Sequence, residues 1–170
     1  MISDLLEASR IKTGNLQLHK AWYDFDNMVS ETVELTQTVS PHHTITVEGN
    51  IGVQVFGEEA HIIQVLTNLL SNAVKYAPKS TKILIRISRV SNYVKVSVKD
   101  DGLGISTEDQ KRIFERFYRV GDVQNHFPGM GIGLYISAEI IKNHGGSLWV
   151  ESEKAHGSTF SFTLPIGEQN

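Results

Sequence analysis

Apolar and polar side chains alternate along two pairs of segments, and this alternation predicts strands. Residues 83–90 (ILIRISRV) and 93–100 (YVKVSVKD) place an apolar side chain at every second position, which is typical of antiparallel strands with one buried face. The dipeptide Ser91-Asn92 between them predicts a hairpin turn. Residues 147–152 (SLWVES) and 158–165 (STFSFTLP) predict a last pair of strands.

Apolar residues spaced three and four positions apart predict helices. The clearest helix covers residues 58–76, and Pro78 ends it. Further helices are expected at 26–39, with Asp26 as the N-cap, at 106–117 and at about 133–144. Residues 1–12 have the pattern of the last turns of another amphipathic helix. The strongest helix has one broad apolar face, formed by Ile62, Val65, Leu66, Leu69, Leu70 and Ala73.

Three shorter segments complete the expected fold. Residues 15–25 suit an edge strand, and residues 43–49 (HTITVEG) and 51–57 (IGVQVFG) predict two strands joined by a hairpin-type turn at Gly49-Asn50. Residues 118–130 show no hydrophobic period, so we expect a mobile loop there. The order of these elements favours an α+β fold, a two-layer α/β sandwich whose mostly antiparallel sheet carries helices on one face.

The composition excludes several classes of protein. With 170 residues, 40% of them hydrophobic, the chain is long enough for one domain with a substantial core. Sixteen basic and 19 acidic residues without long blocks of one sign argue against a dedicated nucleic-acid binder. The absence of cysteine excludes disulfides and thiolate chemistry. No signal peptide and no apolar run of the ~20 residues that cross a bilayer is present, so we expect a soluble protein of a reducing compartment.

The helix segment NLLSNAVKYAP carries four polar side chains on one stripe. Asn68 and Asn72 are four residues apart, and Lys75 and Tyr76 extend the stripe by one turn. Amide oxygens bind hard cations and a lysine suits a phosphate, so the stripe is what a magnesium and phosphate site would present. A solvated polar helix face is the alternative interpretation.

Two glycine-rich segments are further candidates. In DDGLGI, Asp100, Gly102 and Gly104 directly follow a strand, where a carboxylate can accept a hydrogen bond from an exocyclic amine; an ordinary tight turn is the alternative. In PGMGIGLYIS, Gly129 and two further glycines open a helix, whose unpaired N–H groups form an anion site. Leu134 stands where a dinucleotide fingerprint requires glycine, and no Walker or protein-kinase motif occurs.

Together these motifs identify a family. The amide-bearing helix, the DxGxG turn, the aromatic segment RIFERFYRV and the GxGxG helix start resemble, in this order, the N, G1, F and G2 boxes of sensor histidine kinases. Residues 157–164 (GSTFSFTL) resemble their closing G3 box. The resemblance implies the Bergerat ATP-binding fold over residues 16–166. It also implies the end of a truncated second dimerisation helix and linker at residues 1–15 and a short tail at 167–170.

The resemblance implies a role for individual residues in binding Mg²⁺ and ATP. Asn72 would bind Mg²⁺, and with Lys75 at the phosphates it would be catalytic. Tyr76 would pack beside the nucleoside, and Asp100 would accept from the adenine amine. The other expected nucleotide-binding residues are Gly102 and Gly104, which would admit the adenine ring, Ile105 in the pocket wall, Tyr118 and Arg119 in an ATP lid over 118–130, Gly129, Gly131, Gly133 and Leu134 around the phosphates, and Thr159 at the pocket edge.

One position departs from the family pattern, and a second is typical of the family but differs from its hydrolytic relatives. Ala155 stands where the last box usually has its first glycine, and Asn68 stands where hydrolytic relatives carry a glutamate that activates water. In the family, the phosphoacceptor histidine is directly followed by an acidic residue. None of the seven histidines of this chain is followed by one. The resemblance therefore implies a cytoplasmic catalytic domain whose partners are its own dimerisation domain, in a homodimer, and a response regulator. A membrane-anchored parent is compatible with it.

Other functions remain as alternatives. They are an ATPase or conformational switch of the gyrase class, a serine-kinase anti-sigma factor, and a module that binds nucleotide without catalysis.

Overall fold

The computed structural model describes residues 6, 9, 18–77, 82–121 and 129–167. Residues 6 and 9 are helical, and the rest of the predicted segment 1–15 lies outside the described residues. The elements, in chain order, are β1 (Ala21–Asp24), α2 (Phe25–Val39), β2 (Thr44–Glu48), β3 (Gln54–Gly57), α3 (Glu59–Tyr76), β4 (Lys82–Val90), β5 (Tyr93–Asp100), α4 (Thr107–Gln110), α5 (Gly133–Asn143), β6 (Ser147–Ser152) and β7 (Ser158–Pro165).

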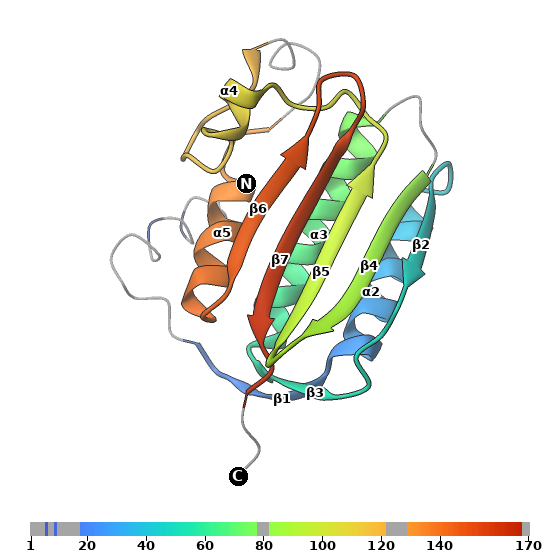
Figure 1. The fold of residues 1–170 in the computed structure, drawn as a ribbon, viewed down its shortest axis with the longest axis vertical. Helices are drawn as coiled ribbons and strands as arrows, with labels where there is room; N and C mark the ends of the chain where they lie inside the picture. Colours follow the sequence, from blue (N-terminus) through green and yellow to red (C-terminus); the bar gives the residue numbers. More distant parts are fainter. Residues whose placement is uncertain (1–5, 7–8, 10–17, 78–81, 122–128, 168–170) are drawn as a thin grey trace.

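Five strands form the main sheet in the order β2-β4-β5-β7-β6, and β1 pairs with β3 in a separate two-stranded sheet. Only β2 and β4 pair in parallel; the other pairs of the main sheet are antiparallel. Helices α2, α3 and α5 cover one face of this sheet (Figure 1). The predicted two-layer α+β sandwich with a mostly antiparallel sheet is therefore confirmed.

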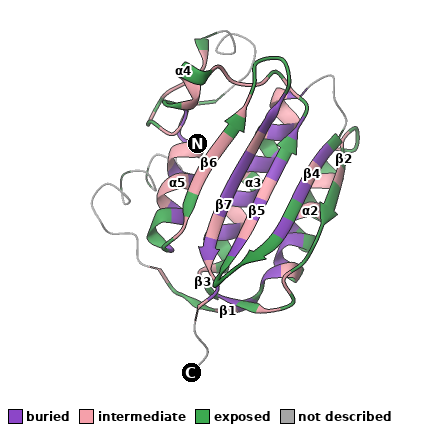
Figure 2. Cartoon of the chain, in the orientation of Figure 1, coloured by how far each residue is buried: buried purple, intermediate pink, exposed green. Residues whose placement is uncertain are grey.

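The strand alternation places the core between the sheet and the helices. In β5, every second side chain from Val94 to Val98 is buried, and the buried residues of the neighbouring β7 lie at the centre of the sheet (Figure 2). Helix α3 contributes the apolar face predicted from the sequence, and its last residue is Tyr76. Full burial of a valine, leucine or isoleucine side chain contributes about 1.5–3 kcal/mol to folding. This layer therefore fixes α3 and α5 relative to the end of β5.

The predicted hairpin over residues 43–57 is wrong. β2 lies parallel to β4, whereas β3 lies antiparallel to β1. Gly49 has φ +82°, and a Cβ there would overlap the carbonyl oxygen of Ile87. The carboxylate of Asp26 accepts from the N–H groups of Ile51 at 3.1 Å and of Gly52 at 2.8 Å. These contacts direct the chain toward α2 instead of back along β2.

Three element boundaries also differ from the predictions. The N-cap of α2 is Asp24, whose carboxylate accepts from the N–H of Asn27 at 2.9 Å, because Asp26 is engaged with the turn before β3. The predicted helix 106–117 contains only one α-helical turn, Thr107–Gln110, and Phe117 has φ +65°, which no α-helix accommodates. In the described part of segment 15–25, the strand covers Ala21–Asp24.

Candidate functional site

A cavity of about 530 Å³ lies between the C-terminal half of α3, the end of β5 and the start of α5. Its volume is in the range of small-molecule sites. The cavity is lined by Asn68, Ser71, Asn72, Lys75, Tyr76, Asp100, Leu103, Gly104, Ile105, Ile113, Tyr118, Arg119, Val120, Gly129, Met130, Gly131, Ile132, Gly133, Leu134, Ser158 and Phe160. Most residues expected at the nucleotide are therefore brought together, and the exceptions are Gly102 and Thr159.

Helix α3 supplies one wall of the cavity. Its polar stripe of Asn68, Asn72, Lys75 and Tyr76 lines the cavity, while its apolar face is buried in the core. Ser71 belongs to the same stripe, three residues after Asn68, and helical spacing alone would have identified it. The helix thus presents two amides, two hydroxyls and an amine along one side of the cavity.

Asp100 ends β5 on the face that the helices cover. Asp100 lies two residues after the buried Val98, so its side chain points to the same face of the sheet, and it is 5% exposed. Its Oδ1 accepts from the N–H of Gly102 at 2.9 Å. Burial raises the pKa of Asp100 to about 6, while backbone hydrogen bonds from Gly102 and Ser158 oppose that shift. A buried carboxylate that lines a cavity is a specific acceptor for an N–H group of a ligand.

The glycines after Asp100 have local structural causes. A Cβ at Gly102 would overlap the carbonyl oxygen of Tyr76. A Cβ at Gly104, where φ is +67°, would overlap the carbonyl oxygen of Glu153. Both glycines therefore permit backbone segments to approach one another, and Gly102 does not line the cavity. Ile105 lines it, as expected.

The start of α5 forms a third wall. Its N-cap is Ile132, which makes no side-chain capping bond, and the first turn contains no acidic residue. Uncapped N–H groups at a helix start favour an anion. A Cβ at Gly133 would overlap the Oδ1 atom of Asn68, whose Nδ2 donates to the hydroxyl of Ser137 at 3.0 Å. Asn68 therefore fixes the start of α5 against α3.

The base of the expected lid is partly described. The N–H of Phe117 donates to the carbonyl of Gly131 at 2.9 Å, so the two ends of the loop lie side by side. Tyr118, Arg119 and Gly129 line the cavity. A Cβ at Gly129 would lie 3.2 Å from the Nζ of Lys75. Residues 122–128 of the predicted loop lie outside the described residues.

The last strand turns a different residue toward the cavity than the one expected. In β7, Ser158 and Phe160 line the cavity, whereas Thr159 does not. Strand alternation places Thr159 on the other face of the sheet. The signal that identifies Ser158 is therefore its period-two relation to the buried Phe160. Two more lining residues, Val120 and Met130, belong to the predicted lid, whereas Leu103, Ile113 and Ile132 were not assigned to the site from the sequence.

The donor set fits a magnesium ion only together with phosphates. Among the described residues, no group of three or more histidine, cysteine, aspartate or glutamate side chains is placed to hold a metal. Mg²⁺ commonly takes few protein ligands and completes its shell with water and substrate phosphates. Asn72 lines the cavity together with the start of α5, and an amide oxygen suits this mode of binding.

A sheet backed by helices, with a glycine-rich helix start and an amide-bearing helix lining one cavity, defines a nucleotide-binding α/β sandwich. The sequence model of the family described as histidine kinase-, DNA gyrase B- and HSP90-like ATPase matches residues 57–168. This match covers more than half of the chain, and the chain belongs to this family.

Several histidine kinases are similar to this chain in sequence or structure. The sensor-like histidine kinase SenX3 of Mycolicibacterium smegmatis is 33% identical over 97% of this chain and 44% of SenX3. Full-length ShkA in complex with AMPPNP superposes with a TM-score of 0.84 at 26% identity, over 99% of this chain and 35% of ShkA. The catalytic domain of histidine kinase ThkA superposes with a TM-score of 0.76 at 28% identity, over 87% of this chain and 98% of ThkA.

The chain therefore resembles the ATPase-type catalytic part of histidine kinases. It spans less than half of the length of SenX3. Within the described ranges, no helix is both long and apolar enough to cross a lipid bilayer.

Proposed function

We propose that this chain binds ATP with Mg²⁺ and transfers the γ-phosphate to a histidine on a dimerisation domain that the chain does not contain. One observation carries the proposal: a single cavity is lined by Asn72 and Lys75, by the buried Asp100 and by the uncapped start of α5. These are the groups that a magnesium ion, a triphosphate and an adenine amine require.

Each wall has its own role in this proposal. Asp100 accepts a hydrogen bond from the adenine amine, where guanine would present a carbonyl. Lys75 and the N–H groups at Gly133 and Leu134 bind phosphate oxygens, which orients the γ-phosphate toward the open side of the cavity. Asn72 holds Mg²⁺, which when bound neutralises part of the charge that phosphoryl transfer redistributes.

Asn68 favours transfer over hydrolysis. An amide cannot take a proton from water, and this amide is also engaged with Ser137. In the proposed reaction, the bond from the γ-phosphorus to the bridging oxygen breaks. A bond to an imidazole nitrogen of the acceptor forms, and ADP leaves. The reaction takes place in the cytoplasm, where the acceptor domain forms a homodimer and passes the phosphoryl group to a response regulator.

The test mixes this chain with a separately produced dimerisation helix pair and ATP labelled at the γ-phosphate. We expect label on the acceptor histidine, lost with Asn72→Ala and lost when the acceptor histidine is replaced by alanine. Release of free phosphate without a labelled acceptor would assign the chain to the gyrase-like ATPases instead. Failure of the wild-type chain to bind Mg-ATP would overturn the proposal.

A further inference from the structure

Helix α4 lies beside the cavity and holds two of its walls, although its own side chains do not line it. The carboxylate of Asp109 accepts a hydrogen bond from the hydroxyl of Tyr118, with 2.6 Å between the oxygens. The adjacent Gln110 donates through Nε2 to the carbonyls of Ile105 and Ser152, both at 2.8 Å. Tyr118 and Ile105 line the cavity, so one helical turn is bonded to two parts of its wall.

The Asp109 carboxylate is itself fixed on α4. Ser106 is the N-cap of the helix: its hydroxyl accepts from the N–H of Asp109 at 3.1 Å and lies 2.6 Å from Oδ2 of the same residue, to which it donates. The hydrogen bonds from Ser106 and Tyr118 hold the pKa of Asp109 below its usual range. The bond to Tyr118 therefore has a charged acceptor at neutral pH and is stronger than a neutral one.

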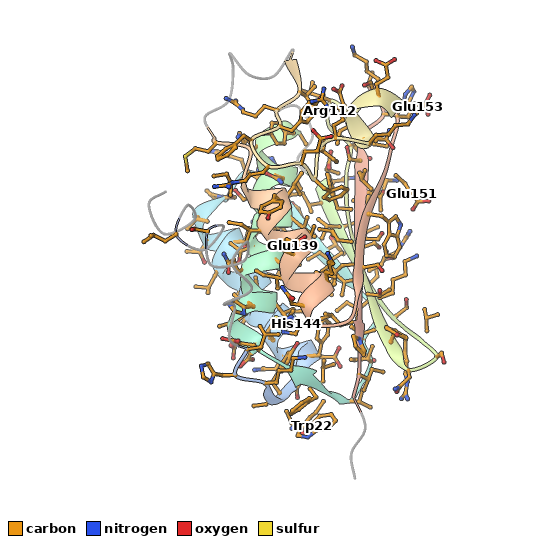
Figure 3. The ribbon with its side chains drawn as sticks, turned by 90° about the vertical axis from the view of Figure 1, so that its left-hand side faces the viewer. Trp22, Arg112, Glu139, His144, Glu151 and Glu153 are labelled. Atoms are coloured by element: carbon orange, nitrogen blue, oxygen red, sulfur yellow. The ribbon has the colours of Figure 1, made fainter. Side chains whose placement is uncertain are left out.

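The aromatic ring of Tyr118 also has a contact that restricts its orientation. The guanidinium of Arg112 lies over the ring, 4.2 Å from its centroid, a cation–π arrangement that favours one ring orientation. Arg112 is found at the α4 end of the molecule (Figure 3). The hydroxyl bonded to Asp109 and the face under Arg112 together favour one orientation for the side chain of Tyr118, a residue that lines the cavity.

We propose that Asp109 is a positioning residue for nucleotide binding, which keeps the Tyr118 ring in the orientation that forms the cavity wall. The inference rests on the proposed function, because it concerns the nucleotide of that same cavity. When the hydroxyl is released, the ring gains rotational freedom that binding must remove. The loss of one ordered side chain of this kind corresponds to about a 5-fold to 10-fold loss of affinity.

The experiment measures the Kd of Mg-ATP by calorimetry on the 170-residue chain. We expect Asp109→Ala and Tyr118→Phe each to weaken binding about 5-fold to 10-fold, and the double variant no more than either single one. Asp109→Asn keeps an acceptor oxygen and restores the affinity to within about twofold. Glu108→Ala, an exposed neighbour on α4, is the matched control with an unchanged Kd.

The unfolding temperature of each variant separates positioning from loss of structure. If Asp109→Ala does not fold, Tyr118→Phe and Asp109→Asn carry the test. Unchanged affinity in Tyr118→Phe, or losses that add in the double variant, would overturn the inference while leaving nucleotide binding intact. A wild-type chain that does not bind Mg-ATP would overturn both this inference and the proposed function.

Discussion

Helices α3 and α5 lie side by side, and their two ends differ. At one end, here called the closed end, polar groups of the protein bond to one another; at the other, the open end, the two helices line the cavity. At the closed end, His144 donates from Nδ1 to the carbonyl of Ile140 at 2.8 Å and accepts at Nε2 from the N–H of Glu58 at 3.1 Å. At the open end, α5 begins at Ile132 with no side-chain cap beside a cavity of about 530 Å³. Figure 3 shows His144 toward the base of α5, away from Arg112.

The two ends therefore satisfy their polar groups differently. The closed end pairs a buried imidazole with two backbone groups of the protein itself, which stabilises the folded state. At the open end, the uncapped N–H groups at the start of α5 and the carboxylate of Asp100 face the cavity. We infer that substitutions of open-end groups proposed to contact the nucleotide change binding more than stability, and that substitutions at the closed end do the reverse.

The largest effect is expected from Asn72→Ala, which should weaken Mg-dependent ATP binding by about 100-fold, because it removes the proposed metal ligand. Asn68→Ala should weaken binding far less, and its main effect should be on stability, since Asn68 holds Ser137 and packs against Gly133. The measurement is the Kd of ATP with and without Mg²⁺ for each variant. If the metal dependence of Asn72→Ala equals that of the wild type, Asn72 is not the ligand.

Asp100 should make binding both adenine-specific and pH-dependent. Because burial raises its pKa to about 6, the charged acceptor is present above this pH, and affinity for ATP should fall up to about tenfold per pH unit below it. Titrations of ATP and GTP from pH 8 to 5 measure both effects.

Asp100→Asn is the control for the Asp100 prediction, because its amide oxygen still accepts but does not titrate. Any pH dependence that this variant retains belongs to the phosphates of ATP. Equal affinity of the wild type for ATP and GTP would refute the role of Asp100.

At the closed end, acid should reduce the stability of the fold. Burial lowers the pKa of His144, as do the nearby Lys20 and His61, while its bond to Ile140 and the charge of Glu58 oppose this. The folded state thus binds fewer protons than the unfolded state. The stabilisation is complete above the unfolded pKa of about 6.5 and is lost as the pH falls below it, by up to about 1.4 kcal/mol per unit.

Urea unfolding at pH 7.5 and 5.5 measures this loss against the variant His144→Gln, which does not titrate. Asp100 has the opposite effect, since its raised pKa adds stability as the pH falls through about 6. This contribution is common to both chains and cancels in the difference. An equal pH dependence of wild type and variant would show that His144 does not carry the effect.

The smallest effect is expected at Ala155, which departs from the family pattern. Its φ of +69° lies in the left-handed region, where alanine is strained by about 1–2 kcal/mol. Ala155→Gly should raise the free energy of unfolding by about 1 kcal/mol, after the greater entropy of glycine in the unfolded chain is subtracted. Gly157→Ala in the same turn is the opposite control, because its Cβ would overlap the carbonyl oxygen of Asp100. Thermal unfolding compares the two, and a less stable Ala155→Gly would contradict the argument.

Local patterns predicted the elements whose burial has a regular period. The alternation around Val96 and the helical face around Leu69 follow from burial on one side, and both are confirmed. The pairing of β2 with β4 depends on residues far apart in the sequence, so a turn dipeptide such as Gly49-Asn50 could not reveal it. The spacing of the aromatic segment suggested a longer helix than Phe117 permits.

The candidate site, like the fold, was predicted only in part. The resemblance to the family boxes implied that Asn72, Lys75 and Asp100 share one site, and all three line the cavity. The choice between Thr159 and Ser158 needed the alternation along β7, in which Ser158 shares a face with the buried Phe160. The bond between Asp109 and Tyr118 joins the single turn of α4 to the irregular backbone after it, where spacing carries no information on contact.

The pairing of β1 with β3 has a consequence for how a preceding domain reaches the nucleotide. β1 enters the fold beside the start of α3, whereas the cavity lies along the second half of this 18-residue helix, which is about 27 Å long. A domain attached before β1 is therefore tethered at a distance from the phosphates. The length and stiffness of that tether set its effective concentration at the cavity. Inserting flexible residues before β1 would then change the rate of phosphoryl transfer and leave the affinity for ATP unchanged.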